Sequence, residues 1–258
     1  MTVASSAPWC PSAAYLYVLH LDNAALAWEY LRRHPDYRHD WAHRHCNLDS
    51  ASKWGLHMLE DPALDARHAL PAWLPGGETV VHLYPDANGT ADATWFRFWT
   101  IRGDKHVFYD GSHMLLQVRG PSGYVRSALS PGLGDGTACT YAVKGSMPKT
   151  YAGYRRVNSV WEALSGAADV LPAATTGPRP GALALFEMQT LQALDATMAG
   201  ATYREIAQAM IGADTVATSW HPDSALRSRV RRLVRRGKTL MRGGYRRLAQ
   251  LDRTQNAR

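Results

Sequence analysis

The chain has 258 residues, 46% of them apolar, and its 29 Lys and Arg outnumber its 22 Asp and Glu, which gives a formal net charge of +7. This length and apolar content suffice for about two buried cores and exclude a disordered or fibrous protein. The longest apolar run near the N-terminus, around residues 15–19, is too short to cross a membrane, and the three cysteines form no Cys-x-x-Cys pair. We therefore expect a cytoplasmic protein with neither a membrane partner nor a disulfide framework.

The N-terminal segment is predicted to be helical. Asp22 or Asn23 can cap a first helix, which should end near His34-Pro35 because the residue before a proline disfavours helical geometry. A second helix is predicted over residues 37–46 and a third over 50–60. This part of the chain should pack as a small helical layer.

Two motifs resemble functional sites but lack essential parts. His39 and His43 stand four residues apart on one predicted helix, a spacing that can hold a divalent metal, but no third ligand is specified. The glycines of residues 131–137 have the spacing of a phosphate-binding loop, but no Lys-Ser/Thr pair or helix start follows them. No nucleophile-elbow pattern occurs. We therefore predict no metal, no cofactor and no enzymatic activity.

Residues 77–145 consist of β-branched and aromatic runs separated by glycine-containing turn signals, which predicts hairpins in an antiparallel meander. A helix is expected over 150–165, and the Pro/Gly/Thr-rich residues 171–182 read as a linker. The expected fold class is α+β: N-terminal helices and the β meander form a domain over 8–170. After the linker, a C-terminal all-α, helix-turn-helix-like domain covers 181–251 and should fold alone.

The C-terminal domain begins with a supporting helix over residues 183–198, stopped by Gly200. Thr202-Tyr203-Arg204-Glu205 has the form of a capping box, so a second helix should start there and close at Gly212. Asp214 can cap a brief third helix, and Asp223 or Ser224 a fourth. In that last helix the predicted buried face comprises Leu226, Val230, Leu233, Val234, Leu240 and Met241. A capped short helix, a tight turn and a basic helix follow one another as in a helix-turn-helix.

The positive charge is concentrated at this end of the chain. Residues 221–258 contain twelve Lys and Arg against two acids, so this tail carries +10 and the remainder −3. Eleven of the twelve are Arg, which makes bidentate contacts to phosphate and guanine. A solvated basic face is the alternative, and a membrane-surface helix is disfavoured because bulky Trp and Phe are missing from the apolar face. The predicted DNA contacts are Arg227, Arg229, Arg231, Arg232, Arg235, Arg236, Lys238, Arg242, Arg246 and Arg247.

Two segments compete for the DNA groove. Residues 213–220 occupy the usual position of a recognition helix but contain no cation. Their few side chains that could hydrogen-bond to bases are Thr215, Thr218 and Ser219. The helix over 224–242 is favoured, with Arg227 and Arg231 as the candidates for base edges and Arg235 and Arg236 on base edges or phosphates. The arginines at its far end, Arg242, Arg246 and Arg247, are the candidates for phosphate contacts. A single such helix seldom gives high specificity, so an oligomer is expected. Its interface could use an aromatic-rich surface, although core packing explains these residues equally well: Tyr15, Tyr17, Trp28, Tyr30, Trp41, Trp54, Trp73, Trp95 and Trp99.

The two ends of the chain also resemble a known family. The strings PSAAY, AWEYLRRHPDYRHDW and WGLHMLEDPALDAR resemble the N-terminal transcriptional regulator-like domain of proteobacterial RovC-like regulators. AGATYREIAQAMIG, the segment around residues 226–233 and Arg242-Gly243-Gly244-Tyr245-Arg246 resemble their C-terminal DNA-binding domain. The resemblance implies a cytoplasmic, nucleoid-associated transcription factor, an activator that binds double-stranded DNA as a homo-oligomer.

Two other functions stay open at this point. The first is an anti-activator that binds another regulator or RNA polymerase and has little DNA affinity. The second is RNA binding, which a preference for single strands would indicate.

Overall fold

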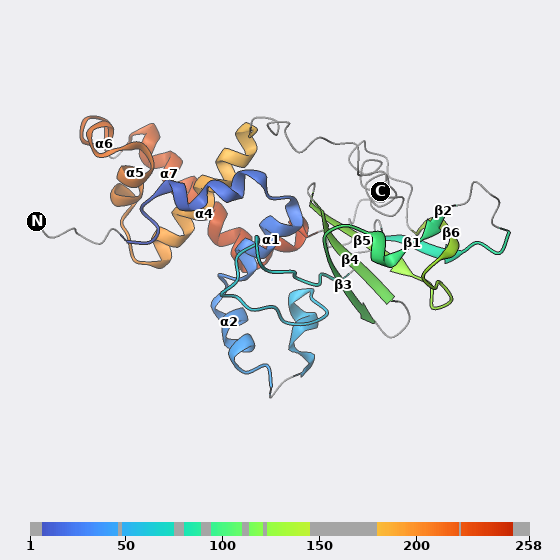
Figure 1. The fold of residues 1–258 in the computed structure, drawn as a ribbon. Helices are drawn as coiled ribbons and strands as arrows, with labels where there is room; N and C mark the ends of the chain where they lie inside the picture. Colours follow the sequence, from blue (N-terminus) through green and yellow to red (C-terminus); the bar gives the residue numbers. More distant parts are fainter. Residues whose placement is uncertain are drawn as a thin grey trace, which may run out of the picture. The chain divides into compact units, whose positions relative to one another are not determined.

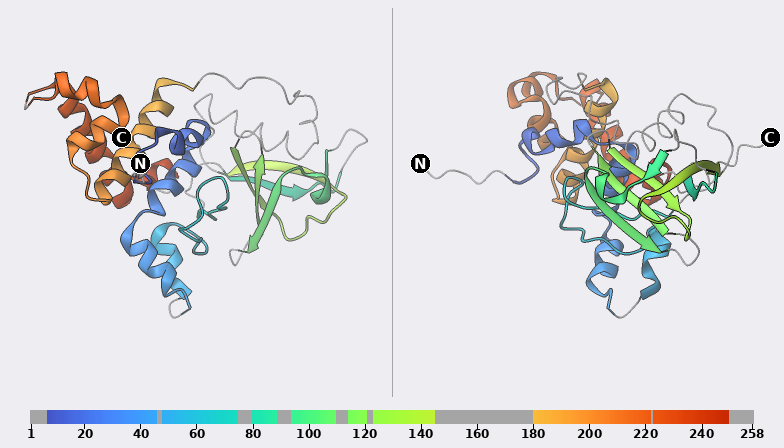
Figure 2. Two further views of the ribbon diagram at one scale, coloured as in Figure 1. Left: turned by 60° about the vertical axis from the view of Figure 1, so that its left-hand side comes forward. Right: turned by 45° about the vertical axis from the view of Figure 1, so that its right-hand side comes forward.

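The computed structural model describes residues 7–45, 48–74, 80–88, 94–109, 114–120, 123–144, 180–221 and 223–249. The contacts divide the chain into two compact units, drawn in Figures 1 and 2. The helical unit contains residues 1–48, 60–70 and 178–249, and the sheet unit contains 49–59, 71–177 and 250–258. This division differs from the expected one into 8–170 and 181–251, because it groups both ends of the chain. The expected helix over 150–165 lies outside the described residues.

The N-terminal helices of the helical unit begin with a 3-10 helix, η1 (Ser12–His20), followed by α1 (Asn23–Leu31) and α2 (Pro35–Ala42). Asp22 caps α1 by accepting a hydrogen bond from the Ala25 N–H at 2.8 Å, which confirms the predicted start. The break before Pro35 is also confirmed. The His34 ring accepts from the Asp36 N–H and caps α2, so this helix begins at the proline itself and ends earlier than predicted.

The C-terminal helices are α4 (Ala182–Met198), α5 (Tyr203–Ile211), α6 (Ala213–Ser219) and α7 (Ala225–Thr239), followed by a π turn, η5 (Leu240–Gly244), and α8 (Tyr245–Leu248). The predicted capping box is present, with Thr202 N–H donating to Glu205 Oε2 at 2.7 Å and Glu205 N–H donating to Thr202 Oγ1. None of the helices in the described residues is long and apolar enough to span a bilayer.

The start of α6 corrects one expectation. This helix begins at Ala213 with Gly212 as its N-cap, and Asp214 lies inside its first turn rather than capping it. Gly212 has a positive φ of 102°, so the chain can turn there directly from α5 into α6. The cap of α7 is as predicted, because the Ser224 hydroxyl accepts from the Arg227 N–H at 3.2 Å.

The core of the helical unit lies between α4, α5, α6 and α7. Its buried residues are Ala193, Ala196, Ile206, Ala207, Val216, Val230, Leu233 and Val234. The N-terminal helices complete this packing: η1 contacts α4, while α8 and η5 contact α1, and Trp9 packs against the same core. Figures 1 and 2 show the blue N-terminal helices lying along the orange and red C-terminal ones. Helix α4 therefore packs on two sides, against α7 and against η1.

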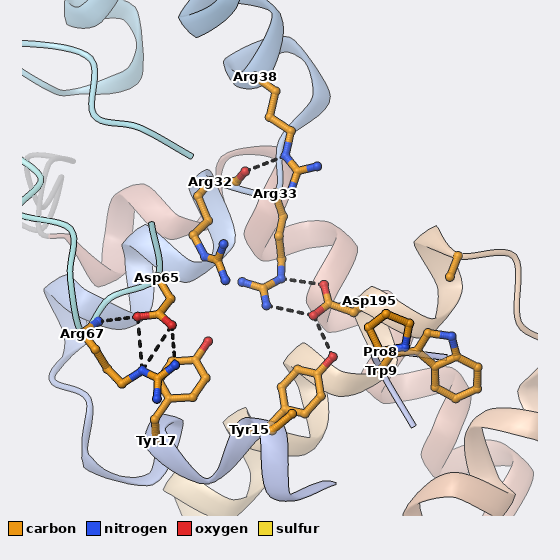
Figure 3. A pocket seen from close by; sticks show the side chains of 12 residues that line it. Pro8, Trp9, Tyr15, Tyr17, Arg32, Arg33, Arg38, Asp65, Arg67 and Asp195 are labelled. Atoms are coloured by element: carbon orange, nitrogen blue, oxygen red, sulfur yellow. Dashed lines mark hydrogen bonds and ion pairs between the residues drawn. The ribbon is translucent and has the colours of Figure 1, made fainter. Parts of the chain in front are cut away.

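A buried polar network joins the two ends of the chain inside this unit. Arg33 donates to both carboxylate oxygens of Asp195 in α4, at 2.6 and 2.8 Å, and also pairs with Glu29 in α1. The Tyr15 hydroxyl donates to Asp195 at 2.8 Å (Figure 3). The Tyr30 hydroxyl donates to Glu187 in α4 at 2.7 Å. Because a buried charge is costly without partners, these contacts fix α4 against η1 and α1.

The sheet unit contains six strands: β1 (Val80–Pro85), β2 (Thr94–Phe96), β3 (Asp104–Tyr109), β4 (Met114–Gly120), β5 (Gly123–Leu129) and β6 (Thr137–Lys144). Their order is β2-β6-β1-β5-β4-β3. The β3–β4 and β4–β5 hairpins are antiparallel as predicted, but β1 runs parallel to β5. The purely antiparallel meander is therefore wrong. Strand β1 lies between β5 and β6, a pairing that alternation along the sequence does not specify.

Two short 3-10 helices also belong to this part of the chain: η2 (Leu48–Trp54) and η3 (Phe98–Thr100). Helix η2 stands where an α-helix over 50–60 was predicted, and that prediction is wrong. Gly55 follows it with a positive φ of 79°, which ends the helical path. The sheet has its own apolar core, formed by Val81, Leu83, Phe96, Ile101, Leu116, Val118, Leu129 and Cys139.

Candidate nucleic-acid interface

The basic helix α7 is held by its apolar face. Of the predicted buried residues, Val230, Leu233, Val234, Leu240 and Met241 are buried, and Leu226 is half-buried against the same core. Their spacing of three and four residues gives one continuous apolar stripe. This stripe fixes the orientation of the helix, so the side of α7 opposite the stripe faces solvent.

Exposed arginines occupy that solvent face. Arg231, Arg232 and Arg235 are exposed on α7, Arg242 on η5 and Arg247 on α8. Lys238 is half-buried, as are Arg227 and Arg246 at the two ends of the surface. Within the described ranges, no carboxylate pairs with the five exposed arginines. We call these eight residues the basic surface.

Two other cations of α7 point instead to α4. Arg229 donates to the Gln189 side chain at 2.8 Å. Arg236 forms an ion pair with Glu187, and its guanidinium carbon lies 5.4 Å from the centre of the Phe186 ring. Because Glu187 also accepts a hydrogen bond from Tyr30 of α1, one carboxylate links the three helices α1, α4 and α7. Arg236 therefore has a role in positioning the basic helix.

The sequence contains a signal for that pairing. Glu187 lies among the inward-facing residues of the predicted 183–198 helix, and it is 5% exposed in the structure. A carboxylate on a buried helix face requires a cation or several hydrogen-bond donors. The position of Glu187 therefore indicates an inward-turned arginine, although not which one.

Gly237 is a further positioning residue, which the sequence analysis missed. It is buried in the last turn of α7, and a Cβ placed there would lie 3.0 Å from Leu194 Cβ and 3.3 Å from the Thr190 carbonyl oxygen of α4. A glycine inside a basic helix gives no apolar signal to a periodicity analysis. Its small size allows α7 and α4 to approach closely.

The basic surface continues past a break in the helix. Gly243 adopts a positive φ of 135°, which breaks the helix and redirects the chain into α8. There Tyr245 is buried, and α8 packs on α1. His34 lies between α1 and α2, and burial lowers the pKa of its ring. The positive charge of Arg242 lowers this pKa further, so Arg242 lies near the junction of the two helices.

Helix α6, the alternative candidate for the DNA groove, is short and mostly exposed to solvent. Of its seven residues only Val216 is buried, while Thr215, Thr218 and Ser219 are exposed. The Thr218 hydroxyl donates to the Thr215 carbonyl at 3.0 Å. The helix carries no cation, so it offers polar side chains but no phosphate-binding charge.

The pair His39 and His43 and the glycine loop of residues 131–137, the two motifs that resemble functional sites, form local contacts. The His39 and His43 ring centres lie 4.2 Å apart, and His43 Nδ1 is 2.8 Å from the His39 carbonyl oxygen. In the parts of the chain that the structure describes, no group of three or more His, Cys, Asp or Glu is placed to hold a metal. The glycine loop connects β5 to β6, and its Gly136 N–H donates to the Phe96 carbonyl at 2.7 Å.

Comparison with family models assigns both ends of the chain. Residues 8–58 match a proteobacterial transcriptional regulator-like domain, and residues 146–250 match the RovC-type DNA-binding domain of a type VI secretion transcription factor. Residues 78–125 match a domain of unknown function, DUF7011. No curated protein matches the chain.

These matches confirm the resemblance to RovC-like regulators. They support a DNA-binding transcriptional regulator and point away from an enzyme. Helices α4 to α8, with the basic surface, lie inside the matched DNA-binding segment. Helices η1, α1 and α2 lie inside the regulator-like one.

Proposed function

We propose that this protein is a transcriptional activator that binds double-stranded DNA through the basic surface. One observation carries the proposal: the five exposed arginines of the basic surface, on α7, η5 and α8 inside the matched DNA-binding segment, have no carboxylate partners among the described residues. Such a surface repels itself at low salt, and a phosphate backbone removes that repulsion with release of counterions. Binding would place the protein on the nucleoid.

Within the basic surface, the position along the helix suggests two kinds of contact. Arg227 and Arg231 lie in the first two turns of α7, where recognition helices meet base edges. Arg242, Arg246 and Arg247 lie around the Gly243 break and suit contacts with phosphates. Arg232, Arg235 and Lys238 extend the surface between them. Arg229 and Arg236 complete the proposed set of cations, with their internal partners holding the helix in place. Helix α6 is the competing groove element.

An oligomer would bring several basic surfaces to one operator, which raises specificity beyond that of one helix. Four of the nine aromatic residues considered for its interface are not available, because Tyr15, Trp28, Tyr30 and Trp73 are buried. Trp95 and Trp99 are exposed on the sheet unit, at 46% and 78%. Light scattering at micromolar concentration measures the assembly, and a monomer mass contradicts it.

The central test is a binding titration of the full chain on duplex DNA from its own upstream region and on a scrambled duplex. If about six cations contact phosphates, log affinity should fall against log salt with a slope near −5, since each contact contributes roughly −0.9. R242A should flatten the slope by about one unit on both duplexes. R231A should cost roughly 1–3 kcal/mol on the preferred site and little on the scrambled one.

R97A provides the matched control, because Arg97 is an exposed cation of the sheet unit and removes the same charge. It should leave both affinities nearly unchanged. Equal losses for R231A and R97A would show that only net charge matters. A wild-type chain that fails to bind its upstream duplex would overturn the proposal in favour of an anti-activator, and a preference for single strands would favour RNA. Transcription in vitro from the bound promoter then tests activation.

A further inference from the structure

The helical unit contains an open pocket of about 420 Å³ that lies apart from the basic surface. Its walls come from η1, the end of α1, α2, the 60–70 loop and α4 (Figure 3). Residues matched by the regulator-like domain and residues matched by the DNA-binding domain therefore line one cavity. This volume is within the range of small-molecule sites.

The pocket lining has an excess of positive charge. Arg32, Arg33, Arg38 and Arg67 line it together with two acids, Asp65 and Asp195. Both acids are already engaged: Asp195 holds Arg33 in a two-point contact, and Asp65 accepts from Arg67 at 2.6 Å. Arg32 pairs with Glu29, which lies behind the wall.

Arg38 is the fourth cation of the pocket lining. Its Nε donates to the Arg32 carbonyl at 2.9 Å, and no carboxylate among the described residues pairs with its terminal nitrogens. Desolvation, followed by the positive charges of Arg32 and Arg33, lowers the pKa of its guanidinium. An anion beside these groups would offset that repulsion.

Aromatic rings form the facing wall. The Tyr15 hydroxyl is fixed by Asp195, and the Arg67 guanidinium carbon lies 4.7 Å from the centre of the Tyr17 ring. Figure 3 shows both rings on the side of the pocket opposite Arg32 and Arg33. The site thus combines fixed guanidinium groups with flat apolar surfaces, which suits a ligand with an anionic head and an organic body.

We propose that this pocket binds a small organic anion, whose carboxylate or phosphate group contacts Arg38 and Arg32 and whose body lies against Tyr15 and Tyr17. Guanidinium forks recognise these two head groups through paired hydrogen bonds. Bound ligand would bridge η1, the end of α1 and α2, and so stabilise the helical unit. The site does not depend on DNA binding, so its test uses no DNA.

The test is thermal unfolding of the full chain in benzoate or inorganic phosphate, with sodium chloride matched for ionic strength. At a concentration roughly twenty times the dissociation constant, the unfolding midpoint should rise by about 4 °C over chloride. R38Q should abolish most of this rise, because it removes the unpaired cation from an exposed rim position without breaking an ion pair. If phosphate alone raises the unfolding midpoint, the pocket binds phosphate esters. If benzoate raises it, the pocket binds carboxylates.

R44Q is the matched control. Arg44 follows α2 and lies over the Trp41 ring at 4.0 Å, outside the pocket lining. It should keep the full response. An equal rise in the wild type, R38Q and R44Q would place the anion elsewhere, for instance on the basic surface, and overturn the proposal. A wild-type midpoint that neither probe raises above the chloride control overturns it as well.

Discussion

Neighbouring arginines on α7 have different surroundings because consecutive helical positions point about 100° apart. Arg235 is exposed, whereas Arg236 pairs with Glu187. The sequence predicted ten cations as one DNA-binding set, since composition and spacing do not tell which of them meet a carboxylate from another helix. The partner of Arg236 stands forty-nine positions away in the chain. Only the folded arrangement of α4 against α7 separates the two roles.

The pair of variants R235A and R236A tests this separation. R236A should lower the free energy of unfolding by about 1–2 kcal/mol, because it leaves the buried Glu187 carboxylate without its cation and the pair is only partly exposed to solvent. R235A should change stability by less than about 0.5 kcal/mol while weakening DNA binding. Urea unfolding and the binding titration measure both quantities. Similar stability losses for the two variants would contradict the assignment.

The Arg33 network predicts a dependence of stability on pH. Ion pairing with Arg33, against the opposing effect of burial, lowers the pKa values of Asp195 and Glu29. A carboxylate with a lowered folded-state pKa contributes stability fully above its ordinary pKa, near pH 4, and loses it as the pH falls towards the folded value. The contribution of these pairs should therefore be present at pH 7 and decline below about pH 4.

D195N measures that contribution. At pH 7 it should cost roughly 3 kcal/mol, because Arg33 stays buried and loses one of its two carboxylates. Measured from pH 5 to pH 3, the gap between wild type and variant should narrow below about pH 4, because the unfolded Asp195 carboxylate then takes up a proton while the folded one, with its lowered pKa, stays ionised. Urea unfolding across this range gives the gap directly. A gap that stays constant down to pH 3 would show that charge pairing is not its cause.

At the scale of elements, local signals predicted helix boundaries well. The caps at Asp22, Thr202 and Ser224 and the break at Pro35 depend on neighbouring residues, and the structure has all four. Strand positions were also largely visible from the β-branched and aromatic runs and the turn signals between them. The neighbour of each strand was not, since the parallel pairing of β1 with β5 joins segments more than forty residues apart. Such pairing depends on which apolar faces meet in three dimensions.

Gly237 is an element-scale feature that mutation can test. G237V should lower the free energy of unfolding by about 2–3 kcal/mol, because its Cβ and methyl groups would meet Leu194 and the Thr190 carbonyl and push α7 away from α4. G181A is the control, since no atom lies within 4 Å of a Cβ at that position. Urea unfolding compares them. A G237V chain as stable as G181A would show that the two helices can separate at no cost.

At the scale of the whole molecule, the helical unit joins residues from both ends of the chain. The sequence suggested that residues 181–258 fold alone, because their apolar stripes can close on one another. The structure instead places η1 against α4 and α1 against α8, and pairs Glu187 and Asp195 with N-terminal side chains. Sequence periodicity identifies the apolar face of a helix, but it does not reveal that α4 packs against both α7 and η1.

Fragment complementation tests this arrangement. Residues 178–258 alone should have little cooperative unfolding, because α4 loses its η1 partner and two buried carboxylates lose their donors. Mixed with residues 1–70, the fragment should regain helical circular dichroism and affinity for duplex DNA. D195N in the longer fragment is the control and should weaken the recovery. A fragment 178–258 that unfolds at the same urea midpoint as the full chain would refute the need for the N-terminal helices.

The contact between Arg33 and Asp195 also has a consequence for synthesis on the ribosome. Its two residues are 162 positions apart, so α1 leaves the ribosome long before α4 exists. At roughly 5–20 residues per second, the wait is on the order of 10 s, which is long compared with chain collapse. During that interval the apolar side of α1 lacks its contacts with η5 and α8, and Arg33 has Glu29 as a partner but lacks Asp195. Folding of the helical unit should therefore be post-translational, and nascent chains stalled before α4 should bind chaperones more than complete ones do.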